Sequence, residues 1–110
     1  MKESDSELRV VLVTAPDLET ATGIARTLVT ERLAACANVV PGLRSIYRWE
    51  GSVQDDAEVL LLLKTRAARC PALAARVKDL HPYEVPEVLE LPVTGGSEAY
   101  LEWVRTESSP

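Results

Sequence analysis

The sequence contains no phenylalanine, one histidine (His81) and two cysteines (Cys36 and Cys70) in 110 residues. A single histidine excludes metal sites that draw several histidines from one chain, such as the H-E-x-x-H zinc motif. Two cysteines outside a C-x-x-C motif are too few for a disulfide framework. We therefore expect reduced thiols and a cytoplasmic location.

Several enzyme and membrane signatures are also missing. The sequence has no G-x-S-x-G, no P-loop and no G-x-G-x-x-G motif. It therefore lacks the motifs that usually mark a serine nucleophile elbow, a phosphoryl-transfer site and a dinucleotide-binding site. No apolar run approaches the roughly 20 residues that cross a bilayer. The acidic start, residues 1–7, lacks the apolar core of a signal peptide. We expect neither an enzyme nor a membrane partner.

Positive charge is scarce, because 12 Lys and Arg stand against 17 Asp and Glu for a net charge of −5. Nucleic-acid binders usually carry the opposite sign, since cations that displace counterions from phosphates supply much of their affinity. We therefore expect no nucleic-acid partner. The length fits one domain over residues 1–110, with 1–7 and 106–110 expected to be flexible ends.

The aliphatic residues that are present fall into short, intense runs with strand or helix spacing. The predicted elements are a strand at Arg9–Thr14, a helix capped by Asp17 and ending near Leu33, a strand at Cys36–Trp49, a strand at Val53–Thr65, a helix from Cys70, a strand at Val88–Val93 and a helix capped by Ser97. Pro41-Gly42 predicts a bulge in the long hairpin. This order predicts an α+β fold of the ferredoxin-like, split βαβ type with an added C-terminal helix.

The apolar run at residues 59–63 has no polar alternation, so it requires burial on both sides of the sheet. Two helices cover only one side, and a contiguous exposed apolar patch usually marks an interface. We predict an oligomer formed through the open sheet face and the long hairpin. The alternative is that the terminal helix and the loops cover this face within one copy.

The densest group of chemically active side chains lies on a segment that contains two prolines, Pro82 and Pro86, and consists of His81, Tyr83, Glu84 and Glu87. Imidazole and carboxylate ligands suit a divalent first-row ion such as copper or zinc, and the prolines stiffen the segment. We therefore predict a metal site of His81, Glu87 and Glu84. The alternative is that His81 caps the preceding helix while Tyr83 forms a hydrogen bond across a subunit boundary.

Aromatic residues on the hairpin suggest a second kind of site. Tyr47 and Trp49 share one face of the strand, where they could stack on a ligand or anchor a subunit contact. Lys64 ends the apolar run, and its side chain could instead extend to solvent at a sheet edge. We predict an inter-subunit pocket of Tyr47, Trp49, Lys64 and Tyr83.

Four segments together resemble the CutA family of divalent-cation tolerance proteins. They are Glu31–Asn38 (ERLAACAN), Pro41–Gly51 (PGLRSIYRWEG), His81–Glu87 (HPYEVPE) and Tyr100-Leu101-x-Trp103. The resemblance covers about Leu8 to Arg105 and implies a ferredoxin-like subunit in a homotrimer, linked to tolerance of copper and other divalent ions. It places the family's histidine at His81 and its acidic residue at Glu87. Some bacterial relatives carry a cysteine where this chain has Val13.

The resemblance also implies that no cofactor is required, although Cu²⁺ or another divalent ion is a possible ligand. The expected partners are two further copies of the chain and divalent metal ions. A PII-like trimer that binds a small signalling molecule between subunits shares this architecture and remains the alternative. Its long loop and basic phosphate contacts are not evident in this sequence.

Overall fold

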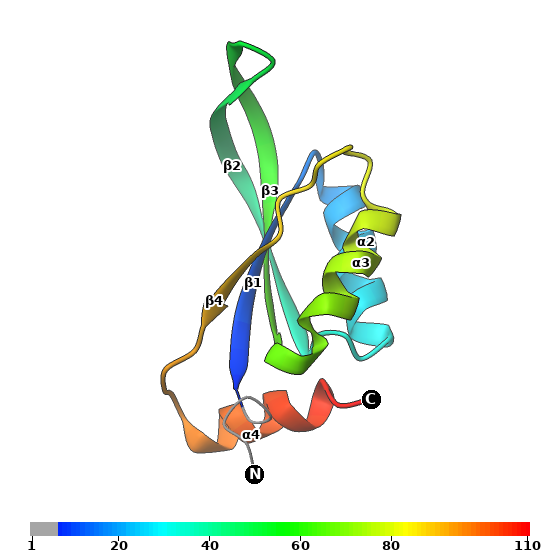
Figure 1. Cartoon of the computed structure of the whole chain (residues 1–110), viewed down its shortest axis with the longest axis vertical. Coiled ribbons are helices and arrows are strands. Elements are labelled where there is room, and N and C mark those ends of the chain that lie inside the picture. The colour runs from blue at the N-terminus through cyan, green and yellow to red at the C-terminus, as the bar shows by residue number, and fades with distance from the viewer. Residues whose placement is uncertain (1–6) are drawn as a thin grey trace.

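The computed structural model describes residues 7–110. Four strands form an antiparallel sheet in the order β2-β3-β1-β4 (Figure 1). The elements of the described residues are β1 (Leu8–Ala15), α2 (Leu18–Thr30), β2 (Cys36–Trp49), β3 (Ser52–Arg66), a 3₁₀ turn (Ala67–Arg69), α3 (Cys70–Leu80), β4 (Leu89–Pro92) and α4 (Glu98–Glu107). This is the predicted ferredoxin-like arrangement with an added C-terminal helix, so the fold prediction is confirmed.

The helices begin where their capping residues predict. The Asp17 carboxylate accepts a hydrogen bond from the Thr20 N–H at 2.7 Å, and Ser97 Oγ accepts one from the Tyr100 N–H at 3.4 Å. Helix α2 stops at Thr30, before the predicted end near Leu33. Arg32 adopts φ 60°, a left-handed conformation that the regular helix cannot contain.

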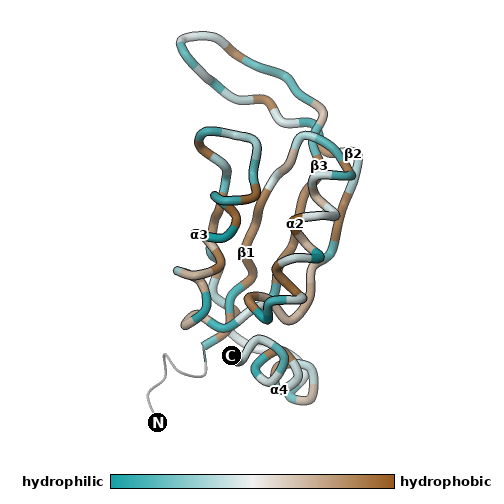
Figure 2. The backbone as a smooth tube through the Cα atoms, turned by 90° about the vertical axis from the view of Figure 1, so that its right-hand side faces the viewer, coloured by the Kyte–Doolittle hydropathy of each residue, from teal (hydrophilic) through white to brown (hydrophobic). Residues whose placement is uncertain are grey.

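The hydrophobic core lies on one face of the sheet, beneath α2 and α3. Val11 and Val13 of β1 and Leu61 and Leu63 of β3 are fully buried there. In Figure 2 the largely hydrophobic β1 is seen between α3 and α2. Alternation along the strands therefore sends every second residue to the opposite face.

That opposite face is apolar, and no helix formed by residues 7–110 packs over it as a layer. Register places Leu12 beside Leu62 and Leu89, and Val10 beside Leu91. Leu89 and Leu91 are 54% and 46% exposed. Helix α4 crosses the end of the sheet and leaves this face open (Figure 1). We call it the open face.

The β2–β3 hairpin extends beyond the rest of the sheet (Figures 1 and 2). The register shifts between Val40 and Leu43, which confirms the predicted bulge at Pro41-Gly42. Gly42 takes φ 85°, a conformation that strongly favours glycine. Arg44 holds the Asp55 carboxylate through two hydrogen bonds of 2.8 and 2.9 Å, and these fasten the two strands beyond the bulge.

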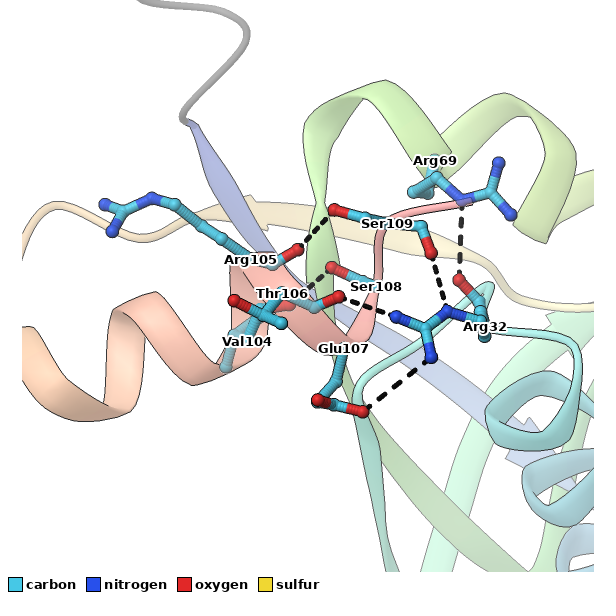
Figure 3. A network of polar contacts seen from close by, with 8 residues as sticks. All are labelled: Arg32, Arg69, Val104, Arg105, Thr106, Glu107, Ser108 and Ser109. Carbon is cyan, nitrogen blue, oxygen red and sulfur yellow. Dashed lines mark hydrogen bonds and ion pairs between the residues drawn. The ribbon is translucent and has the colours of Figure 1, made fainter.

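The end at residues 106–110 was expected to be flexible, and within it residues 106–109 pack against the loop that follows α2 (Figure 3). The Arg32 guanidinium donates to the carbonyls of Thr106 and Ser109 at 2.8 and 2.7 Å. Ser108 is fully buried, and its hydroxyl donates to the Val104 carbonyl at 2.6 Å. These contacts hold the segment, whereas residues 1–6 of the other expected flexible end lie outside the described residues.

Candidate functional site

Residues 81–88 form a connector that runs from the end of α3 past the base of the hairpin to β4 (Figure 1). Its first residue, His81, is 7% exposed, and its backbone N–H caps α3 by donating to the Val77 carbonyl at 2.8 Å. Imidazole Nε2 lies 2.7 Å from the Thr14 carbonyl oxygen, and Nδ1 accepts the Tyr83 N–H at 3.1 Å. Because Nδ1 accepts, Nε2 carries the proton and donates to Thr14.

Both ring nitrogens of His81 are therefore engaged with backbone groups. A metal ion could bind His81 only if one of these two hydrogen bonds broke. The imidazole also lies against the Tyr83 ring, with centroids 4.6 Å apart. This geometry agrees with the alternative interpretation, in which His81 caps the preceding helix. The imidazole also positions Tyr83, through the hydrogen bond to its N–H and the contact with its ring.

Tyr83 reaches from the connector to a buried carboxylate on β3. Its hydroxyl donates to Glu58 Oε2 at 2.6 Å, and Glu58 is only 7% exposed. Burial, then the hydrogen bond to Glu58, raises the pKa of the Tyr83 hydroxyl well above its ordinary value of 10.0. The hydroxyl therefore stays protonated and remains a donor near neutral pH.

Glu58 was not among the predicted site residues. The sequence does contain an indication of its role. Glu58 is two and four residues before Leu60 and Leu62 on β3, so its side chain points to the same face of the sheet. A carboxylate in line with an apolar stripe is unusual and requires a buried partner. The partner, Tyr83, lies 25 residues away in sequence and could not be paired with it without the fold.

The connector and the hairpin base line an open pocket of about 690 Å³, which we call the acidic pocket. Its lining residues come from β1, both hairpin strands and the connector. They are Thr14, Ser45, Ile46, Tyr47, Trp49, Glu58, Pro82, Tyr83, Glu84, Val85 and Glu87. Glu58, Glu84 and Glu87 supply its charge, and none of these lining residues is Lys, Arg or His.

The negative charges of the acidic pocket act on one another. Burial, then the charge of Glu58, raises the pKa of Glu87 above its ordinary value of 4.5. At the hairpin wall, the Tyr47 hydroxyl donates to Asp56 Oδ2 at 2.5 Å, and this bond raises the pKa of Tyr47. The carboxylates at this pocket therefore face one another with no cationic side chain among the lining residues.

The structure brings together some of the residues of the predicted inter-subunit pocket and some of those of the predicted metal site. Tyr47, Trp49 and Tyr83 all line the acidic pocket, whereas Lys64 lies near the far end of β3 and its ammonium donates to the Asn38 side-chain carbonyl. Lys64 lines a separate, smaller pocket of about 190 Å³ beside α4.

Of the three residues predicted as metal ligands, two lie at the acidic pocket and one does not. Glu84 and Glu87 line the acidic pocket, and His81 does not. Within residues 7–110, no group of three or more His, Cys, Asp or Glu side chains is arranged to hold a metal ion. A single copy thus offers carboxylates in a shared pocket and no preformed coordination cage.

The two cysteines are thiols that lie apart from the acidic pocket. Cys36 Sγ lies 3.5 Å from the Tyr100 hydroxyl, and Cys70 is buried at the start of α3. A helix N-terminus ordinarily lowers a thiol pKa. For Cys70, burial and then the charge of Glu90 outweigh this and raise the pKa to about 12. Cys70 is therefore an unreactive core thiol.

Replacing His81 by alanine should lower the free energy of unfolding by about 2 kcal/mol, because the buried Thr14 carbonyl loses its donor and Tyr83 loses its support. Urea denaturation at fixed protein concentration measures this loss. His81→Gln, whose amide can still donate to Thr14, should recover part of it. A loss below about 0.5 kcal/mol would contradict the positioning role.

These observations define a class: a ferredoxin-like α+β protein with an acidic, aromatic-walled pocket and an uncovered sheet face. The sequence comparison then identifies the family. The model of the CutA1 divalent ion tolerance proteins matches residues 9–107, so the chain belongs to this family. The family is named for tolerance of divalent ions and not for a reaction.

Individual relatives agree with this assignment. The divalent-cation tolerance protein CutA of Thermus thermophilus is 57% identical over 96 residues, which are 87% of this chain and 93% of the relative. Protein CutA of Homo sapiens is 50% identical over 98 residues, or 87% of this chain and 55% of the relative. The chain thus spans only about half the length of this human relative and of the Arabidopsis thaliana and Oryza sativa relatives that it matches.

Solved structures show the same fold. The divalent cation tolerance protein of Thermus thermophilus superimposes with a TM-score of 0.91 at 54% identity, over 93% of this chain and 99% of the other. CutA1 of Oryza sativa gives a TM-score of 0.90 at 48% identity, over 92% and 93% of the two chains. None of the helices in the described part of the chain is long and apolar enough to span a membrane.

Proposed function

We propose that this protein serves in divalent-cation tolerance by binding divalent ions, Cu²⁺ among them, at the acidic pocket. The observation that carries the proposal is the gathering of Glu58, Glu84 and Glu87 around one cavity whose lining contains no Lys, Arg or His. Uncompensated carboxylates attract cations, and more strongly where burial reduces screening. We propose no catalytic reaction and no required cofactor.

The ligands of the ion are the pocket carboxylates in this proposal. Glu84 and Glu87 were predicted as ligands from the sequence, and Glu58 joins them from the floor of the cavity. His81, the third ligand predicted from the sequence, acts instead by holding Tyr83 against Glu58. With few protein ligands, the ion keeps part of its water shell and binds weakly.

The working form in this proposal is a homotrimer assembled through the open face. Support comes from the apolar side chains exposed there, such as Leu89 and Leu91 on the edge strand, and from the extended hairpin. The number three comes from the family resemblance. We further propose a cytoplasmic location, which suits the two unpaired thiols. Named relatives include a chloroplastic and a periplasmic protein.

Titration calorimetry with Cu²⁺ tests the site. Glu87→Gln should weaken binding about tenfold, because one charge of the pocket is lost. Affinity should also fall as the pH is lowered, and this decline should begin above the ordinary Glu pKa of 4.5, since the raised pKa of Glu87 lets protons compete earlier.

The matched control is Glu102→Gln, which removes one exposed carboxylate from α4, at the opposite end of the molecule. It should leave the Cu²⁺ affinity unchanged. Equal affinity of wild type and Glu87→Gln would refute the pocket as the metal site. A tenfold loss in a folded His81→Ala variant that Tyr83→Phe does not reproduce would restore His81 as a direct ligand, because Tyr83→Phe removes the hydrogen bond to Glu58 and leaves the imidazole in place.

A small-molecule signalling role, as in PII-like trimers, is the second candidate. The volume of about 690 Å³ favours it, because such a cavity is typical of sites for small organic molecules. The absence of Lys and Arg from the lining argues against nucleotides, whose phosphates are usually bound by cationic side chains.

A further inference from the structure

Arg32 has a backbone conformation that arginine does not favour. Its φ of 60° lies in the left-handed region, directly after the end of α2. Its N–H donates to the Val29 carbonyl at 3.1 Å, and the N–H of Leu33 donates to the Leu28 carbonyl at 2.9 Å. This is the Schellman pattern of helix ends, in which the left-handed residue is usually glycine. Because arginine is a good helix former, contacts elsewhere in the chain must hold Arg32 in this conformation.

The contacts that hold Arg32 come from the end of α4 (Figure 3). The guanidinium donates to the carbonyls of Thr106 and Ser109 at 2.8 and 2.7 Å, and Nη1 lies 3.9 Å from Glu107 Oε1. Carbonyl groups at a helix C-terminus lack partners within the helix, and the helix dipole favours a cation there. A guanidinium can bond two such acceptors at once, because its N–H groups form a planar fork. One side chain therefore joins the end of α2 to the end of α4.

Helix α4 packs on a small apolar cluster of its own. Val104 is the one buried residue of the helix, and it packs with Leu8 and Ala35 in a cluster that is separate from the main core beneath α2 and α3. The free energy needed to separate two elements rises with the apolar area that becomes exposed. A helix with so little buried area can therefore leave the sheet while the main core stays folded.

We propose that α4 together with Ser108 and Ser109 is a strap that undocks from the sheet as one unit, and that Arg32 is its fastener. In the docked state the strap holds Arg32 in the left-handed conformation, and Arg32 holds the strap. Undocking exposes Leu8 and Ala35 at the end of the sheet and frees the turn after α2. This inference concerns a conformational device and depends neither on the acidic pocket nor on metal binding.

Hydrogen exchange of the full chain tests the strap. In the wild type, the amides of α4 should exchange together and at least about tenfold faster than those of β1 and β3 in the main core. The decisive variant is Arg32→Gly, because glycine accepts the left-handed conformation but lacks the guanidinium. It should speed exchange in α4 at least about tenfold more, since charge-assisted hydrogen bonds are lost. Exchange in β1 and β3 should stay the same or become slower.

Arg76→Ala is the matched control. Arg76 holds the Glu31 carboxylate at the same end of α2 through two hydrogen bonds of 2.9 and 3.0 Å, so its loss should leave exchange in α4 unchanged. All proteins are compared at a concentration at which light scattering gives them the same mass, because dissociation would also change exchange rates.

Two results would overturn the proposal. Unchanged exchange of α4 in Arg32→Gly would show that Arg32 does not fasten the strap. Exchange of α4 at the rate of β3 in the wild type, or equal acceleration of both in Arg32→Gly, would show that α4 opens only when the whole chain unfolds.

Discussion

Replacing Leu61 by alanine is expected to lower the free energy of unfolding by about 3 kcal/mol, the typical cost of such a cavity in a well-packed core. Leu61 is fully buried on the face of β3 beneath the helices, and its neighbours across the sheet include Val13. The surrounding strands are fixed by hydrogen bonds on both sides of β3, so the core cannot collapse to fill the space.

Urea denaturation at one fixed protein concentration measures the change, because the stability of an oligomer depends on concentration. Leu18→Ala is the matched control. Leu18 is 53% exposed at the start of α2, and its truncation should change the free energy by less than about 0.5 kcal/mol. Similar losses for the two variants would show that the core is not where the structure places it.

Leu62→Asp should leave the chain folded and dissociate the proposed trimer. Leu62 is adjacent to Leu61 in sequence but lies on the open face, beside Leu12 and Asn38. In a single chain the new carboxylate remains accessible to water. In a trimer packed through this face it would be buried without a partner, at a cost of several kcal/mol in each copy.

Light scattering after size-exclusion chromatography measures the assembly. The wild type should have about three times the chain mass of 12.0 kDa, and Leu62→Asp should have the mass of one chain. Leu18→Asp is the control, because the same side chain at an exposed helix start leaves the open face intact. A wild-type mass of 12.0 kDa would refute the oligomer.

Most of the fold could be predicted from local chemistry. The bulge at Pro41-Gly42 and the caps at Asp17 and Ser97 follow from residues whose conformational preferences are strong. The end of α2 could not be placed, because Arg32 in a left-handed conformation is not a residue that signals a helix stop. Its long-range contacts with residues 106–109 stabilise that turn and also hold the C-terminal segment.

The candidate site was only partly predictable. The sequence placed Tyr83, Glu84 and Glu87 on one stiff connector, and the structure places all three at one cavity. The alternation of residues along β3 could not show that Glu58 is buried under Tyr83. The sequence also could not show that both ring nitrogens of His81 form hydrogen bonds with backbone groups. These facts depend on how the connector crosses the sheet, which is a tertiary property.

The position of β1 has a consequence for how the chain reaches its native state. β1 comes first among the strands, yet it lies between β3 and β4, so Leu12 pairs with Leu62 and Leu89. The β2–β3 hairpin forms between segments that are adjacent in the sequence. Both edges of β1, in contrast, pair with strands far along the chain, β3 and β4, and pairing between segments so far apart in sequence slows folding. β4 pairs over only four residues. Its amides should therefore be the first of the sheet to exchange with solvent, and this edge is the first to open.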